Sequence, residues 1–131
     1  MLNFKQYTDM TECYIGNNVA LSTNNVSNIF NNMRNLINVQ FNHPNIVDMA
    51  NTYHNCRNLT GSPVCGNNVT NMYSTYGNCI RLVTPVCGPN VMYMSYTYYN
   101  CTNLTNAVCG NNVKIMDSTY KLHYYHKLDN L

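Results

Sequence analysis

The sequence is poor in charged residues, which make up 9% of its 131 residues, and it contains no tryptophan. An ordinary globular domain carries about 25% charged residues. The formal net charge is +2 and no run of Lys or Arg occurs, so the electrostatic footprint of a nucleic-acid-binding protein is missing. No stretch approaches the roughly 20 apolar residues that span a bilayer. We therefore expect neither nucleic-acid binding nor membrane insertion.

Hydrophobic residues make up 45% of the chain, and many of them are Tyr, Met or Cys, which number 12, 8 and 7. The core is therefore expected to be mixed and polarizable. Asn is abundant and often paired, and low charge with many Asn residues is typical of prion-like disordered tracts. Val, Met, Tyr and Leu recur at regular intervals, however, whereas disordered tracts lack periodic apolar anchors. We therefore expect a folded chain.

An internal repeat is the strongest feature of the sequence. Successive units begin at Ile46, Val69, Val91 and Val113, which are 23, 22 and 22 residues apart, and a degenerate unit begins at Val26. Apolar residues at positions 1, 4, 8 and 11 of a unit would lie on one face of a helix. A later Val and a Gly that permits a tight corner indicate a brief strand between two turns.

One such unit cannot bury its apolar face alone, whereas stacked neighbours form a continuous core. The repeat therefore predicts an α/β repeat solenoid, a right-handed coil of about five units, each with a short strand and a short helical arm. The solenoid should span residues 23–120. The least repetitive segments, residues 1–22 and 121–131, are expected to form N-terminal and C-terminal caps.

Equivalent residues of stacked units should lie roughly 4.8 Å apart, where two like charges would repel by about 3 kcal/mol. Asn avoids this repulsion because its amide both donates and accepts hydrogen bonds. Two Asn columns are therefore predicted to link the units, although the preference of Asn for turns also explains its recurrence. The first column is Asn45, Asn68, Asn90 and Asn112, and the second is Asn55, Asn78 and Asn100, which Asn32 precedes.

The cysteines also follow the repeat, as the columns Cys56, Cys79, Cys101 and Cys65, Cys87, Cys109. Buried free thiols, disulfides within a unit and disulfides between units are all compatible with these columns. The total of seven is odd, so one thiol must stay free or link to another chain.

No Cys-x-x-Cys pair occurs, which argues against zinc, and we predict no metal and no cofactor. His54 near Cys56 could suggest a Cys–His nucleophile, but the equivalent positions hold Gly77 and Tyr99. His54 is therefore interpreted as a variable exposed residue. We expect no catalytic residues and no enzymatic activity.

Two segments resemble the repeat of the BspA-like leucine-rich-repeat surface proteins. One is Val69-Thr-Asn-Met72 followed by Thr75-Tyr76, Asn78-Cys79 and Leu82, and the other runs from Val91 to Leu104. The family consists of bacterial surface adhesins, and similar repeats occur in phage tail and other virion proteins. The resemblance therefore implies a leucine-rich-repeat-like fold and an extracellular recognition surface. It transfers no catalytic or ligand-binding residue.

The sequence thus predicts a non-enzymatic extracellular binding or adhesion module on a cell surface or a virion, similar in role to a tail fibre. Residues 1–15 contain no apolar run, so no secretory signal peptide is seen. The variable residues Tyr73, Tyr93, Tyr96 and Tyr99 are expected to contact a protein or carbohydrate, because the ring packs while the hydroxyl hydrogen-bonds. The alternative is a structural repeat subunit that stacks end to end into fibres, since open ends pair readily and low charge favours association.

Overall fold

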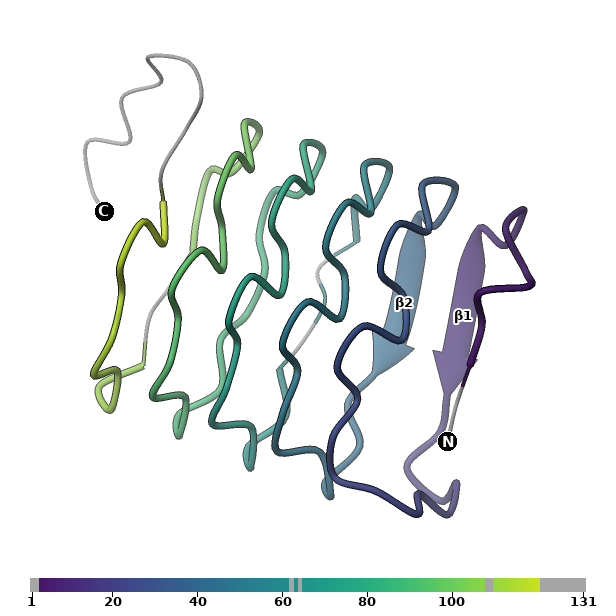
Figure 1. Ribbon diagram of the computed structural model, residues 1–131, viewed down its shortest axis with the longest axis horizontal. Helices are drawn as coiled ribbons and strands as arrows, with labels where there is room; N and C mark the ends of the chain where they lie inside the picture. Colours follow the sequence, from purple (N-terminus) through teal and green to yellow (C-terminus); the bar gives the residue numbers. More distant parts are fainter. Residues whose placement is uncertain (1–2, 62, 64, 108–109, 121–131) are drawn as a thin grey trace.

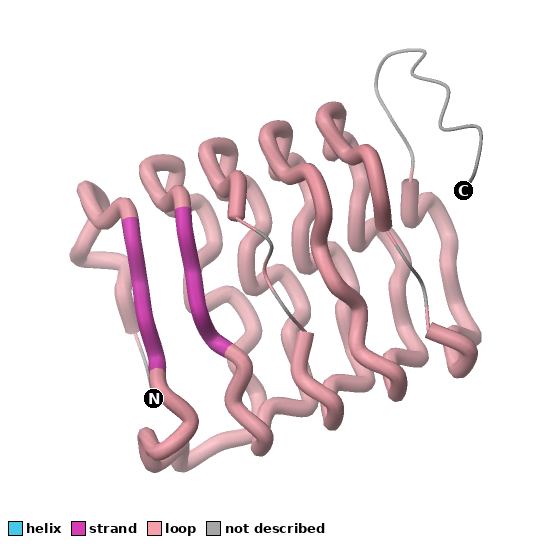
Figure 2. The backbone as a smooth tube through the Cα atoms, turned by 180° about the vertical axis from the view of Figure 1, so that it is seen from behind, coloured by secondary structure: helices cyan, strands magenta, loops and turns pink. Residues whose placement is uncertain are grey.

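The computed structural model describes residues 3–61, 63, 65–107 and 110–120, and it shows a row of coils stacked side by side (Figure 1). The described residues contain two regular elements, the strands β1 (Glu12–Ile15) and β2 (Asn38–Phe41). These strands pair in parallel at the N-terminal end of the row (Figure 2). Within this part of the chain there is no apolar helix of membrane-spanning length.

The predicted α/β solenoid with helical arms is wrong. No helix is present in the described residues, and the two short strands form an open sheet. The apolar residues that suggested the arm are nevertheless buried, since Ile46, Met49 and Tyr53 are each 1% exposed. The spacing therefore identified the residues that face the interior, but it assigned them the wrong backbone conformation.

Left-handed residues explain why the arm is not helical. Asn51 and Asn55 have φ angles of 56° and 63°, whereas an α-helix needs φ near about −63° at every residue. Two left-handed residues four positions apart bend the chain repeatedly, so apolar side chains return to the interior every three or four residues. The equivalent pairs in the other coils are Asn28 and Asn32, Ser74 and Asn78, and Tyr96 and Asn100.

The backbone hydrogen bonds of this segment run mainly between coils. The N–H groups of Met49 and Tyr53 donate to the carbonyl oxygens of Asn71 and Thr75, each over 2.9 Å, while Thr52 closes a local turn onto Met49. An α-helix would instead satisfy these groups within one segment. Each coil is therefore held by the next, in the register of the repeat. Parallel bridges record this register at Asn25–Asp48, Asp48–Asn71, Asn71–Tyr93 and Tyr93–Ile115.

On the opposite side of the coils, the regular strands of the described residues are β1 and β2. In β2, Val39 and Phe41 are buried while Gln40 is exposed, as expected for a half-buried strand. The later coils carry Pro63 and Pro85 here, and proline cannot donate to a ladder. Two backbone hydrogen bonds of 3.1 Å join these two coils on this side. Cys65 N–H donates to Val86 O, and Val86 N–H donates to Pro63 O.

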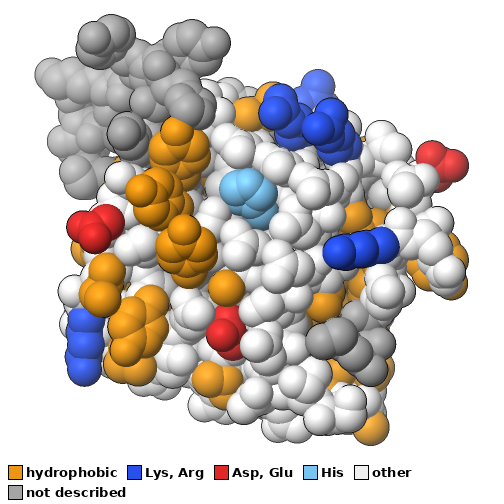
Figure 3. Space-filling model, viewed as in Figure 1, with side chains coloured by type: hydrophobic (Ala, Val, Ile, Leu, Met, Phe, Trp, Pro, Cys, Tyr) orange, Lys and Arg blue, Asp and Glu red, His pale blue; other side chains and the backbone are white. Residues whose placement is uncertain are grey.

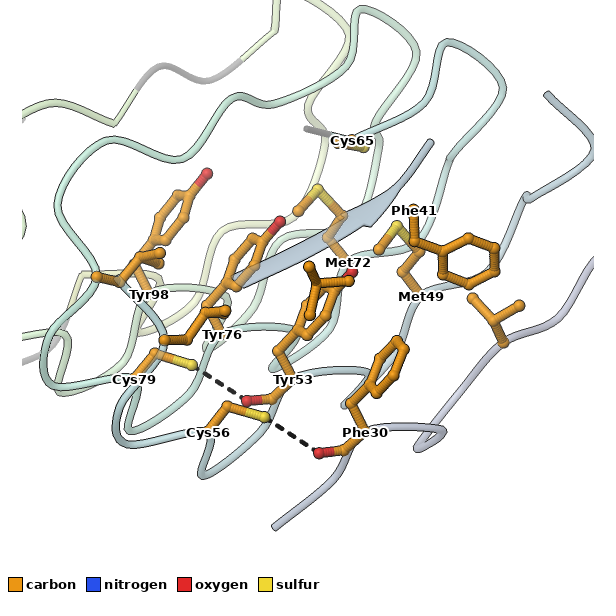
Figure 4. Close-up of a cluster of buried hydrophobic side chains, with 14 of the residues drawn as sticks. Phe30, Phe41, Met49, Tyr53, Cys56, Cys65, Met72, Tyr76, Cys79 and Tyr98 are labelled. Atoms are coloured by element: carbon orange, nitrogen blue, oxygen red, sulfur yellow. Dashed lines mark hydrogen bonds between the residues drawn. The ribbon is translucent and has the colours of Figure 1, made fainter. Parts of the chain in front are cut away.

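A column of stacked aromatic rings fills the interior (Figure 4). Phe30, Tyr53, Tyr76 and Tyr98 lie ring on ring, with centroids 5.4, 5.4 and 5.8 Å apart and interplanar angles of at most 3°. Phe4 extends the column at the N-terminal end, 5.1 Å from Phe30. The buried hydroxyl of Tyr76 has no hydrogen-bond partner in the described part of the chain. Stacking in register therefore takes precedence over satisfying this polar group.

A ladder of asparagine amides runs parallel to the aromatic column. The Nδ2 group of Asn55 donates to Asn32 Oδ1 over 2.7 Å, Asn78 donates to Asn55 over 2.8 Å, and Asn100 donates to Asn78 over 3.1 Å. All four residues are left-handed, a conformation that Asn tolerates better than other residues with a Cβ atom. Asn therefore serves both the backbone turn and the contact between coils.

We expect the two roles of Asn78 to separate by mutation. Asn78→Gly keeps the left-handed turn but leaves Asn55 Oδ1 and Asn100 Nδ2 without their partner, and should lower the free energy of unfolding by about 1–3 kcal/mol. Asn78→Ala should cost about 1 kcal/mol more, because alanine is strained in this conformation. Urea unfolding monitored by circular dichroism measures both. The exposed control Asn111→Ala should change stability by less than about 0.5 kcal/mol, and equal stability of Asn78→Gly and the parent would contradict the ladder's role.

Candidate binding face

Three of the four tyrosines singled out from the sequence contact one another. The ring of Tyr96 lies 5.9 Å from that of Tyr73 and 5.6 Å from that of Tyr99, in tilted or edge-on geometry. Tyr73 and Tyr96 are 46% and 38% exposed, and Tyr99 is half-buried. We call Tyr73, Tyr96 and Tyr99 the tyrosine cluster. On the face shown in Figure 3, apolar side chains gather toward the C-terminal coils.

Tyr93 lies apart from these ring contacts. It is bridged to Asn71 on one side and to Ile115 on the other, and its side chain is 42% exposed. Ile115 and Met116 in the next coil are 45% and 44% exposed. Tyr93 therefore adds apolar surface toward the last described coil rather than joining the tyrosine cluster.

Tyr96 has an unusual backbone conformation for a bulky residue, with φ at 58°. The left-handed region costs an ordinary L-residue about 1–2 kcal/mol, and such strain is concentrated at functional sites. The equivalent left-handed residues of the other coils are Asn28, Asn51, Ser74 and Ser118. Sequence reasoning treated Tyr96 as one variable residue among several. The signal that could have singled out Tyr96 is that the same position of every other coil holds Asn or Ser.

The Asn45 column links the coils in a different way from the ladder. The side-chain amides of Asn68, Asn90 and Asn112 donate to backbone carbonyls of the preceding coil, over 2.8, 2.7 and 3.0 Å. The acceptors are Pro44, Asn67 and Pro89. Asn45 donates its backbone N–H to His43 Nδ1. These amides therefore fix a turn of each coil on the backbone of its neighbour.

The column of Cys56, Cys79 and Cys101 is built from thiols that donate hydrogen bonds. Each Sγ lies 3.1 Å from a carbonyl oxygen of the preceding coil, on Phe30, Tyr53 and Tyr76 respectively, and Figure 4 shows the first two bonds. These three cysteines, together with Cys13 and Cys65, are free thiols. Cys87 is half-buried and its Sγ contacts Gly88 O. Cys109 lies outside the described residues.

Burial keeps these thiols protonated. It raises the pKa of Cys56, Cys65 and Cys101 to about 12 and that of Cys79 well above its ordinary value of 9.0. A reactive cysteine needs a depressed pKa and access to solvent. Cys56, Cys65, Cys79 and Cys101 have neither property.

His54 contacts a serine rather than the neighbouring cysteine. Its Nδ1 atom lies 2.9 Å from Ser74 Oγ, whereas Cys56 donates to Phe30 O. Burial lowers the pKa of His54, which favours the neutral ring. Ser74 is only 6% exposed, so its hydroxyl is not presented to a substrate. The described residues also hold no group of three or more His, Cys, Asp or Glu side chains suited to a metal ion.

A groove of about 770 Å³ lies beside the carboxyl ends of β1 and β2 and is lined by residues 14–19 and 39–42. Sequence reasoning missed it, because residues 1–22 were treated only as a cap. Two exposed surfaces are therefore candidates for binding: the tyrosine cluster and this groove.

No protein-family model, curated protein or solved structure matches the chain. Function is therefore inferred from the exposed side chains themselves.

We expect thiol labelling to separate the buried column from Cys13, which is half-exposed. With a pKa of about 12 for Cys56 and Cys101, roughly one thiol in ten thousand is ionised at pH 8, and the folded chain also shields it. Iodoacetamide should therefore modify Cys13 faster than Cys56, Cys79 and Cys101, which should react only as fast as the chain opens. Peptide mass spectrometry measures each rate, with guanidinium-unfolded protein as the control. Equal rates for Cys79 and Cys13 in the folded chain would contradict the burial of the column.

Proposed function

We propose that the chain is a non-catalytic binding module on a cell surface or a virion, and that the tyrosine cluster contacts a protein or carbohydrate on another surface. The observation that carries this proposal is the left-handed backbone of Tyr96. Asn would meet the same backbone requirement at lower cost, as Asn28 and Asn51 do in two other coils. A bulky ring at this position is explained by a use at the surface.

Tyrosine suits such a contact because it combines a large rigid ring with a hydrogen-bonding hydroxyl and loses little conformational entropy on binding. Contacts among Tyr73, Tyr96 and Tyr99 restrict the rings before a partner arrives, which lowers the cost of ordering them. Tyr93 and Ile115 add exposed apolar surface nearby. Clustered exposed apolar side chains are typical of interaction sites.

The stacked coils support the same proposal. The interior columns fix the backbone, so exposed positions can vary without disturbing the core. The resemblance of the repeat to that of the BspA-like surface adhesins, and to similar virion proteins, favours an extracellular setting. A fold shared among proteins does not by itself define a ligand, and the tyrosine cluster is the specific element.

We expect Tyr96→Asn to separate stability from binding. Asn relieves the backbone strain, so the free energy of unfolding should stay constant or rise by up to about 1 kcal/mol. Binding should fall at least about tenfold, because the central ring of the tyrosine cluster is lost. Urea unfolding measures stability, and binding of the labelled protein to panels of intact cells and immobilised glycans measures recognition.

Tyr7→Asn, which removes a 52% exposed ring outside the tyrosine cluster, is the matched control. A Tyr96→Asn protein that binds as well as the parent would disprove the role of the cluster.

A structural subunit that stacks into fibres is the second candidate. One edge of β1 is unpaired in the described sheet, because β2 is its single neighbour there. Toward the other end of the stack, Ile115 and Met116 are exposed. An unpaired edge at one end and an apolar surface at the other permit a head-to-tail contact, which propagates without closing.

If the ends do pair, fibres should form as the protein concentration rises, and Met116→Lys should prevent them by placing a charge in the contact. Negative-stain electron microscopy and sedimentation velocity detect the assembly. Lys114→Ala, a change in an exposed residue of the same coil that removes a charge, should still form fibres. A parent protein that stays monomeric at high concentration rules this function out.

A further inference from the structure

The groove beside β1 and β2 has the chemistry of a separate ligand site. Its lining, residues 14–19 and 39–42, contains no charged residue. A ligand with a fixed charge would therefore find no counter-ion there, and burial of an unpaired charge is costly. This lining favours a neutral ligand with many hydrogen-bonding groups.

The amides in the groove are available to such a ligand. Asn17, Asn18, Gln40 and Asn42 are all exposed, and their side chains make no hydrogen bond to the described part of the chain. By contrast, the amides of the ladder are engaged between coils. Each amide offers one acceptor oxygen and two donor hydrogens. A sugar hydroxyl, which both donates and accepts, matches this pattern.

Tyr14 gives the groove an aromatic surface. Its side chain is 76% exposed, and it lies directly opposite Gln40 in the parallel register of the two strands. Because paired residues project to the same side of a sheet, the ring and the amide are presented together. The face of an aromatic ring is electron-rich, so it attracts the weakly positive C–H bonds of a sugar ring. The neighbouring Gln40 can then reach the hydroxyls.

The groove is backed by two paired strands. Ile15, Val39 and Phe41 belong to its lining, and their side chains are anchored in the core on the face of the sheet opposite Tyr14 and Gln40, at 8%, 8% and 3% exposure. The backbone that carries Tyr14 and Gln40 is therefore held in place before a ligand arrives. The volume of about 770 Å³ falls within the usual range for small-ligand sites, about 300–1,000 Å³.

We propose that this groove binds a neutral oligosaccharide, with Tyr14 packing against a sugar ring and the amides of Asn18, Gln40 and Asn42 bonding its hydroxyls. An extended peptide added to the edge of β1 is the competing occupant. Such a peptide would pair with the strand backbone and would leave the four amides unexplained. The saccharide accounts for the ring, the amides and the absence of charge. The proposal does not depend on the tyrosine cluster.

The test is titration calorimetry of the whole chain with maltotetraose, cellotetraose, mannotetraose and chitotetraose. Saturable binding of at least one is expected. Tyr14→Ala should weaken it about tenfold or more, while Tyr14→Phe, which keeps the ring, should stay within about threefold. Asn18→Ala, in an exposed turn, should weaken it severalfold and gives a second variant if Tyr14→Ala fails to fold.

Two variants serve as controls. Tyr7→Ala removes another exposed ring and Tyr96→Asn alters the tyrosine cluster, and both should bind the oligosaccharide like the parent. Loss of partner binding in Tyr96→Asn with the oligosaccharide affinity retained would therefore separate the two sites.

Several results would overturn the proposal. They are failure of all four oligosaccharides to bind, equal affinity of Tyr14→Ala and the parent, and tighter binding of a sulfated oligosaccharide than of its neutral counterpart. Displacement of the oligosaccharide by an uncharged β-forming peptide whose affinity is unchanged in Asn18→Ala would identify the groove as a peptide site instead.

Discussion

The structure depends on backbone hydrogen bonds that join each coil to the next in register. In the arm segment, N–H groups such as those of Met49 and Tyr53 donate to carbonyls about one repeat later in the chain. Left-handed residues make a helix impossible there, so these groups have no comparable partner within their own segment. A buried backbone donor must be paired, and the neighbouring coil provides the acceptor. No coil is therefore stable by itself, and the interior exists only as a property of the stack.

This register selects the side chains of the interior. Each buried side chain lies next to the side chain at the same position of the neighbouring coil. Like charges would repel there, so the interior favours side chains that pack against, or hydrogen-bond to, the neighbouring coil. Tyr53 and Tyr76 stack ring on ring, and Cys79 donates to the backbone of the coil before it. Thr52 does the same through a hydroxyl that lies 3.2 Å from Val26 O and 2.8 Å from Met49 O. The scarcity of charge in the sequence thus has a structural cause. Burial in this interior raises the pKa of Cys56 and Cys79, and it lowers the pKa of the part-buried His54.

Exposed positions are free from this rule, and both proposed sites lie where the repeat is broken. Tyr96 replaces the Asn or Ser of its column at the cost of backbone strain. Tyr14 lies on β1, before the regular units begin, beside amides that no ladder uses. A position that departs from the repeat without serving the stack is the best indicator of function in such a chain. The two surfaces are on different coils, so each is proposed on its own evidence.

The sequence by itself determined the repeat, its register and the residues that face the interior. Spacing of 22 or 23 residues is repeated in the parallel bridges, and Met49, Met72 and Met94 are buried because periodic apolar residues must be covered whatever the backbone does. The helical arm was wrong because residues three or four apart return to one face both in a helix and in a chain bent at left-handed residues. The sequence predicts a ladder at Asn55 and assigns no role to Asn51, and the φ angle of a residue is not visible in its side chain. Only the tertiary structure decided this, since the left-handed conformation is held by bonds to other coils. It also decided the groove and the ring contact of Tyr96 with Tyr73, because both bring together residues that are distant in the sequence and are adjacent only after the coils have stacked.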